Sequence, residues 1–160
     1  MVQIIDNFFP REIKLEIYEL LQRPKWEFTA GGSPHNFWQM KLTDEEYFNT
    51  YLFNEIQLRL DRKFSRIERI YVNGQTAMQS GVPHTDDAET TFLYYSELSW
   101  SKKYQGNLVF FDEDTKEENR VVEYKSNRAI LFPAHLTHYA SPPNRLFSGL
   151  RTSLAYKLWN

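Results

Sequence analysis

One segment near the C-terminus decides the fold class, and it reads GLRTSLAYKLW over residues 149–159. Successive side chains of a β-strand point to opposite faces, so we expect Arg151 and Ser153 on one face and Leu150 and Leu154 on the other. An arginine on so apolar a strand is costly to bury alone, and its guanidinium can hold a carboxylate through two charge-assisted hydrogen bonds. The segment therefore predicts a strand with a carboxylate-binding face, although a salt bridge at the sheet edge is the alternative role for Arg151.

The second half of the chain contains further runs of this kind. Glycine, proline, serine and charged clusters separate short β-branched and aromatic segments that we expect to be strands: Ile67–Val72, Thr90–Tyr95, Leu108–Phe111, Val121–Tyr124, Ala129–Phe132 and Leu150–Trp159. This spacing is typical of a β-sandwich or a small barrel. The acidic stretch 112–119 is expected to form a solvated hairpin loop.

The first half predicts a short strand followed by two long amphipathic helices. In the first helix, which Asp6 or Asn7 would cap, apolar residues recur at helical spacing: Ile13, Ile17, Leu20 and Leu21. The second begins at the capping box Thr43–Glu46 and has an apolar residue at every fourth position: Phe48, Leu52, Ile56, Leu60 and Phe64. The turn-rich stretch 30–36 between them is expected to be a surface loop.

The composition fits one domain over residues 1–160, helix-rich over 1–65 and β-rich over 66–160. Hydrophobic residues make up 41% of the chain, and 4 Trp, 10 Tyr and 12 Phe exclude a disordered or collagen-like protein. The net charge of -2 lacks the basic excess that nucleic-acid binding requires, so nucleic acid is not an expected partner.

The chain contains no cysteine, which excludes disulfides, cysteine zinc sites and iron–sulfur clusters. Any metal must therefore be held by His, Asp or Glu. No apolar run approaches the roughly 18 residues of a membrane span, and the N-terminus lacks the pattern of a secretory signal. We expect a cytoplasmic protein that does not bind membranes.

Metal-ligand chemistry concentrates at His84 and Asp86. On an extended segment, residues two apart project to the same side, so both side chains can reach one ion. A histidine from another strand would complete two imidazoles and one carboxylate, the set that leaves open positions on non-haem Fe(II). His135 and His138 compete for this role, and their spacing allows only one of them to face the ion. The alternative is a surface turn with an aspartate cap.

In these features the sequence resembles the 2-oxoglutarate- and Fe(II)-dependent dioxygenases, specifically the small prolyl 4-hydroxylase-like members. The resemblance covers most of the chain and rests on ordered motifs: His84-Thr85-Asp86, the Phe132-Pro133 run leading to His138, and Arg151-Thr152-Ser153. It implies a mostly β protein, a double-stranded β-helix or jelly roll supported by the two long helices. One departure is Arg151, because collagen-type prolyl hydroxylases commonly have lysine there.

The resemblance also implies roles for individual residues. The metal ligands and catalytic residues are His84, Asp86 and His138. Arg151 would bind the distal carboxylate of 2-oxoglutarate, with Ser153 assisting. A tyrosine often joins this site, and Tyr95 is the first candidate and Tyr71 the second, although both are also typical core residues.

The activity implied by the resemblance is hydroxylation of an unactivated C–H bond with release of succinate and CO2. Fe(II), 2-oxoglutarate and O2 take part, with ascorbate as an optional reductant. The expected substrate is a prolyl residue in a peptide or protein, and a free amino acid, nucleobase or small metabolite is the alternative. A non-catalytic jelly-roll binding module is the rival of another class. The oligomeric state stays open.

Overall fold

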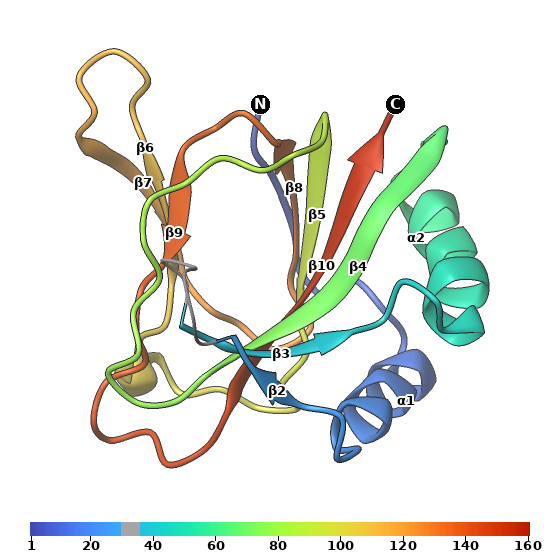
Figure 1. Cartoon of the computed structure of the whole chain (residues 1–160), viewed down its shortest axis with the longest axis horizontal. Helices are drawn as coiled ribbons and strands as arrows, with labels where there is room; N and C mark the ends of the chain where they lie inside the picture. The colour runs from blue at the N-terminus through green and yellow to red at the C-terminus, as the bar shows by residue number, and fades with distance from the viewer. Residues whose placement is uncertain (30–35) are drawn as a thin grey trace.

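Two antiparallel β-sheets face each other in the computed structural model, which describes residues 1–29 and 36–160 (Figure 1). The large sheet has the strand order β1 (Gln3–Ile5), β8 (Ala129–Pro133), β5 (Thr90–Tyr95), β10 (Arg151–Trp159), β4 (Arg66–Gln75), β3 (Trp38–Lys41) and β2 (Glu27–Phe28). The small sheet has the order β7 (Glu118–Val122), β6 (Leu108–Phe111) and β9 (His138–Ala140). The predicted β-rich second half is confirmed.

The central strand of the large sheet is β10, which pairs with β4 on one side and β5 on the other. Its first eight residues are buried, because one face meets the small sheet and the other meets helices. Leu154 and Tyr156 pack into the core under the helices, whereas Arg151 and Ser153 line a cavity between the sheets. The predicted alternation along this strand is confirmed.

Helices cover the outer face of the large sheet (Figure 1). They are α1 (Arg11–Leu21), a π-helical turn η1 (Tyr47–Leu52) and α2 (Phe53–Leu60), which continues η1 directly. The prediction of two long α-helices is wrong, since α1 has 11 residues and α2 has 8.

The second helix is shorter than predicted because it begins after the predicted capping box and ends before Phe64. Thr43 does not cap it; its hydroxyl donates to the Ile70 carbonyl at 3.2 Å and accepts from the Ile70 amide at 2.9 Å, which ties this segment to β4. The helix stops at Asp61, whose φ of 46° is left-handed. Phe64 therefore lies beyond the helix but still packs in the same core.

The predicted cap of the first helix is also wrong. The residue before α1 is Pro10, and no side chain caps the helix there. Asp6 instead pairs with Lys125 and Arg128 at 2.6 and 2.7 Å, and these partners hold the pKa of its carboxyl at about 2. Asn7 has a φ of 54° and forms the bend before the helix.

Several short strands were not expected, namely β2, β3 and β9. The acidic loop is confirmed as an exposed hairpin connection, although β7 already begins at its end, at Glu118. The predicted loop at 30–36 lies outside the described residues except for its last position. In the described part of the chain, neither helix is long and apolar enough to cross a membrane. The cytoplasmic location stays a prediction.

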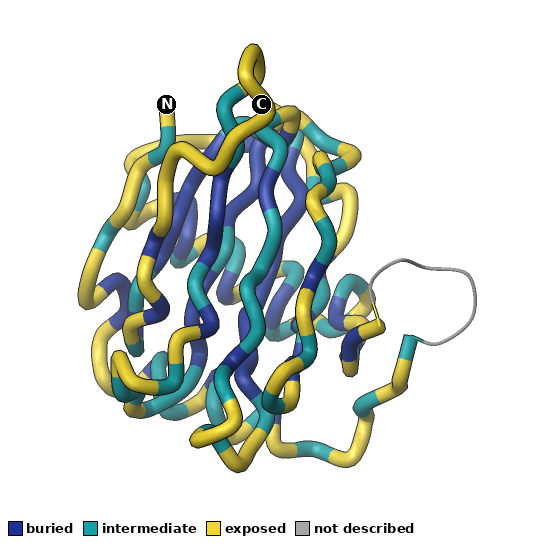
Figure 2. The backbone as a smooth tube through the Cα atoms, turned by 90° about the vertical axis from the view of Figure 1, so that its left-hand side faces the viewer, coloured by how far each residue is buried: buried dark blue, intermediate teal, exposed yellow. Residues whose placement is uncertain are grey.

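Two apolar cores form, one on each face of the large sheet. The outer core joins the helices to this sheet and includes Ile17, Phe48 and Leu154. The inner core lies between the sheets and includes Phe110 and Phe132. Figure 2 shows that buried stretches follow the middle of the strands, while exposed stretches follow their connections. Polar side chains facing the inner space are thus surrounded by apolar ones.

Asn127 joins the N-terminal segment to the large sheet, and its replacement tests this junction. Its side-chain oxygen accepts from the Phe9 amide at 3.0 Å and from the Tyr94 hydroxyl at 3.1 Å, and its amide donates to the Phe9 carbonyl. Its φ of 60° also favours asparagine over alanine. We expect Asn127→Ala to lower the free energy of unfolding by about 3 kcal/mol in chemical denaturation. Asn54→Ala, at an exposed position of α2, is the control and should change it by less than about 0.5 kcal/mol.

Candidate metal centre

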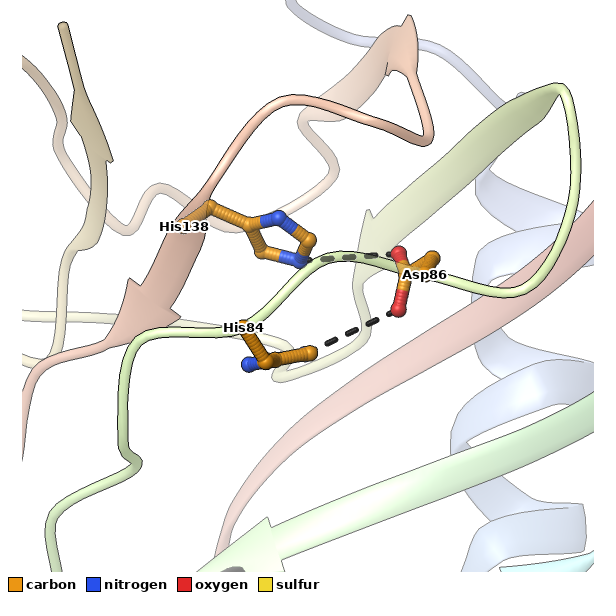
Figure 3. Close-up of side chains that lie close together, drawn as sticks. All are labelled: His84, Asp86 and His138. Atoms are coloured by element: carbon orange, nitrogen blue, oxygen red, sulfur yellow. Dashed lines mark ion pairs between the residues drawn. The ribbon is translucent and has the colours of Figure 1, made fainter. Parts of the chain in front are cut away.

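Backbone pairing brings the three predicted ligands together. His84, on the connection from β4 to β5, exchanges backbone hydrogen bonds of 3.0 and 2.9 Å with His138 on β9. The Asp86 amide donates to the Ala134 carbonyl at 2.8 Å, which fixes the same connection two residues later. One ligand atom from each of His84, Asp86 and His138 lies within 4.8 Å of the others. Figure 3 shows both imidazoles turned toward the Asp86 carboxylate.

The orientation of each imidazole is set by a local hydrogen bond. The Nδ1 of His84 lies 2.9 Å from the Val82 carbonyl oxygen, and that of His138 lies 2.8 Å from the Leu136 carbonyl oxygen. A carbonyl can only accept, so both Nδ1 atoms carry the proton and both Nε2 atoms present a lone pair. These Nε2 atoms lie 3.6 and 3.5 Å from the Asp86 carboxylate oxygens.

The environments of Asp86 and His138 keep both side chains unprotonated at neutral pH. Burial raises the pKa of Asp86, but the Lys157 ammonium, His138 and hydrogen bonds from Lys157 and Thr91 outweigh it and hold the pKa at about 2. Burial lowers the pKa of His138 to about 4, against the opposite effect of Asp86. Metal ligands must be deprotonated, and Asp86 and His138 meet this condition at neutral pH.

The second candidate histidine lies elsewhere. The side chain of His135 is 70% exposed, and its Nε2 lies 3.5 Å from the Glu113 carboxylate on the acidic hairpin loop. His138, by contrast, is buried beside the other two ligands. The spacing argument that only one of the two faces the ion agrees with this arrangement.

A buried lysine that none of the sequence motifs includes adjoins the centre. The Lys157 ammonium contacts Oδ2 of Asp86, and the Thr91 hydroxyl donates to the same oxygen at 2.6 Å. Lys157 lies on the face of β10 that carries Arg151 and Ser153. The period-two argument that picked out Arg151 applies equally to a lysine six residues later, so the signal was present.

Arg151 is buried among polar groups that satisfy only part of its guanidinium. Its relative exposure is 1%, its Nε donates to the Gly106 carbonyl and its Nη1 to Oε1 of Gln75, both at 2.7 Å. Its Nη2 has no hydrogen-bond partner among the described residues. The Tyr95 hydroxyl is the other buried side-chain polar atom without a partner in the described residues. Unpaired buried donors are costly, so both are suited to a ligand.

Strand phase separates the two neighbouring tyrosines. The Tyr95 ring stacks on Tyr124 at 4.0 Å, and the guanidinium carbon of Arg151 lies 5.4 Å from its centroid. Burial raises the pKa of Tyr95 to about 12, despite the lowering effect of Arg151, so its hydroxyl keeps its proton. Tyr94 points to the opposite face and donates to Asn127.

Tyr71, the second tyrosine candidate, lines a cavity together with His84 and Asp86. Its ring centroid is 5.6 Å from the Lys157 ammonium and 5.8 Å from the guanidinium carbon of Arg69. Both cations flank this ring. Tyr71 also lines the cavity that Arg151 and Ser153 line, and its role in holding the same carboxylate stays a prediction.

One narrow cavity between the sheets connects these parts. Its walls include the histidines of the centre, the polar face of β10 and apolar side chains: His84, His138, Arg151, Ser153, Lys157, Leu93, Leu108 and Phe132. A wider cavity of about 410 Å³ opens beside the same centre, between β3, β4 and the ligand-bearing connection. We call it the mouth; its polar lining includes Gln39, Arg69, Asn73, His84 and Asp86. Two imidazoles and one carboxylate fit a non-haem Fe(II), and the unpaired Arg151 and Tyr95 atoms fit a carboxylate.

No known family model matches the sequence, and no curated protein sequence is detectably similar. Solved structures do share the fold. A Pseudomonas putida prolyl-4-hydroxylase superposes with a TM-score of 0.78 at 16% identity, covering 99% of this chain and 92% of that one. A Trichoplax adhaerens prolyl hydroxylase, solved with a hypoxia inducible factor peptide fragment, gives 0.76 at 16% identity, covering 99% and 83%.

A third similar structure is HygX from Streptomyces hygroscopicus, solved with nickel, 2-oxoglutarate and hygromycin B. It gives a TM-score of 0.69 at 13% identity and covers 98% of this chain and 81% of that one. At these identities the likeness establishes the fold. The chain has the jelly-roll fold of prolyl 4-hydroxylase-like 2-oxoglutarate/Fe(II) oxygenases, as its sequence motifs predicted.

Gly106 makes room for Arg151, and a methyl group there tests this contact. A Cβ at this position would lie 2.9 Å from both Cδ and Nε of Arg151, and the φ of 76° is left-handed. We expect Gly106→Ala to lower the free energy of unfolding by about 2 kcal/mol, measured by chemical denaturation. Gly149→Ala is the control, since the three atoms nearest to its Cβ would all belong to the Phe147 ring, the first at 3.1 Å. An equal effect of the two substitutions would contradict the special role of position 106.

Proposed function

We propose that this protein is a 2-oxoglutarate- and Fe(II)-dependent dioxygenase that hydroxylates an unactivated C–H bond and releases succinate and CO2. One observation carries the proposal. A narrow cavity is lined by both histidines of the His–Asp–His cluster and by Arg151, whose Nη2 has no hydrogen-bond partner among the described residues. A small dicarboxylate with a metal-chelating 2-oxoacid end would pair with these two kinds of group.

The proposed role of each residue follows from its position in the cavity or the cluster. His84, Asp86 and His138 would hold Fe(II) and leave positions for 2-oxoglutarate and O2, which together supply the oxidising chemistry. Arg151 and the Tyr95 hydroxyl, each with an unpaired polar atom in the described residues, would hold the distal carboxylate, and Ser153 lines the cavity together with Arg151.

The apolar walls of the same cavity keep water from the reacting groups. Leu93, Leu108 and Phe132 line it beside the polar residues. Exclusion of water strengthens each charged contact made inside the cavity, because the local dielectric is low.

The proposed substrate is a prolyl residue in a peptide or protein, acted on by the whole chain as one catalytic domain. The shared fold with two prolyl hydroxylases supports it, one of them solved with a peptide fragment. A polar small molecule is the second candidate, because the amides of Gln39 and Asn73 and the guanidinium of Arg69 line the mouth. HygX, which has the same fold, was solved with hygromycin B. Proline-containing peptides and polar metabolites can be compared by 2-oxoglutarate-dependent gain of one oxygen atom, measured by mass spectrometry.

The metal assignment is tested without a substrate. Anaerobic addition of Fe(II) and 2-oxoglutarate should produce the visible metal-to-ligand charge-transfer band of a chelated 2-oxoacid, recorded by absorption spectroscopy. His138→Ala should abolish the band, because one imidazole ligand is lost. His135→Ala is the matched control and should keep it, since this exposed side chain pairs with Glu113 instead. A folded parent protein without the band would overturn the proposed function.

The carboxylate site is tested by removing a single oxygen atom. Tyr95→Phe deletes a hydroxyl that has no partner within the described structure, so the free energy of unfolding should stay within about 0.5 kcal/mol of the parent. Its affinity for 2-oxoglutarate, titrated through the charge-transfer band, should fall about tenfold, because one hydrogen bond to a carboxylate is lost.

Tyr94→Phe is the matched control for this measurement. It removes the hydrogen bond to Asn127 and should cost about 1 kcal/mol of stability without changing 2-oxoglutarate binding. Unchanged 2-oxoglutarate affinity in Tyr95→Phe would remove Tyr95 from the site.

A further inference from the structure

Lys157 is a buried cation that the proposed function does not use. Its side chain is 3% exposed, and its ammonium contacts Oδ2 of Asp86, a proposed metal ligand. The Thr91 hydroxyl, 3.3 Å from the same ammonium, also donates to that oxygen. Two donors therefore hold one oxygen of the carboxylate.

Packing alone gives no reason for a lysine at this position. Burying an ammonium carries a large desolvation penalty, and apolar residues of similar volume are often as stable or more stable. The cross-strand neighbour of Lys157 on β4 is Arg69, and like charges placed opposite each other are destabilising. The Asp86 carboxylate is the acidic partner that balances Lys157.

The pairing of Lys157 with Asp86 changes the net charge of the centre. Two neutral imidazoles and one carboxylate would lower the charge of a bound divalent cation by one unit. With the Lys157 ammonium against Asp86, that unit is cancelled, so the occupied centre keeps the full charge of the ion. Charges this close and this well buried interact strongly, since little water screens them.

Building on the proposed function, we propose that Lys157 is a positioning residue, a built-in counter-ion of Asp86 that weakens metal binding and strengthens binding of the 2-oxoglutarate dianion. The two effects have opposite signs and a common cause. The ammonium repels the cation and competes for Asp86, and the more positive occupied centre attracts an anion. A merely structural role would move both affinities in the same direction.

The test is Lys157→Gln, which removes the charge and keeps a hydrogen-bond donor. Fe(II) affinity is measured by anaerobic titration against a competing chelator, and 2-oxoglutarate affinity by the charge-transfer band at saturating Fe(II). We expect the dissociation constant for Fe(II) to fall at least about tenfold and that for 2-oxoglutarate to rise at least about tenfold.

Two control variants isolate the charge. Lys157→Arg keeps a positive charge on β10 although its guanidinium differs in size and geometry, so it should not produce the opposite shifts of the two constants expected of Lys157→Gln. Lys41→Gln makes the same chemical change on β3, where the side chain is 79% exposed, and should change neither.

Each outcome decides the proposal. Weaker binding of both Fe(II) and 2-oxoglutarate by Lys157→Gln, or no change in either, overturns it. If this variant unfolds without metal, saturating Fe(II) should refold it, because the ion replaces the lost ammonium; failure to refold also overturns the proposal. Absence of Fe(II) and 2-oxoglutarate binding in the folded parent would instead defeat the proposed function itself.

Discussion

The alternation of side chains along β10 is the constraint on which the rest of the structure depends. This strand is central in the large sheet and buried on both faces, so each of its residues must satisfy one of two environments. Leu154 and Tyr156 meet the helices, and the Tyr156 hydroxyl donates to the Phe48 carbonyl in η1. The opposite face carries Arg151 and Lys157 into the cavity. A shift of one residue would exchange the two sets and bury both cations under the helices.

Two buried cations on one strand face need anionic partners, and this need organises the cavity. Lys157 meets the Asp86 carboxylate, so its charge is balanced within the chain. Among the described residues, the Arg151 guanidinium donates to a carbonyl and to the Gln75 amide oxygen and lies over two tyrosine rings, and its Nη2 is left for a ligand. The two ends of the cavity thus differ in kind: one contains a complete ion pair beside two imidazoles, and the other contains a cation with spare donors.

The sequence was informative where one local pattern sufficed. Period-two alternation predicted the β-rich half and the shared face of Arg151 and Ser153, and motif order predicted the fold. Predictions from local patterns were wrong where a side chain bonds to a partner distant in the sequence instead of to its own helix. Asp6 could cap a helix but pairs with two cations on the connection from β7 to β8, and Thr43 bonds to β4 instead of its own helix. Alternation places Lys157 on the Arg151 face, but no local pattern indicates its partner Asp86, which lies 71 positions away.

The ligands of the metal centre differ in what holds them. The rings of His84 and His138 are oriented by carbonyl groups two residues before each of them, and the two backbones pair directly. Their geometry is therefore a property of local backbone and persists with or without an ion. Asp86 has no such local partner for its carboxylate, which is oriented by Thr91 and Lys157 from two strands of the opposite sheet. The carboxylate is accordingly the proposed ligand through which the large sheet would influence a bound ion.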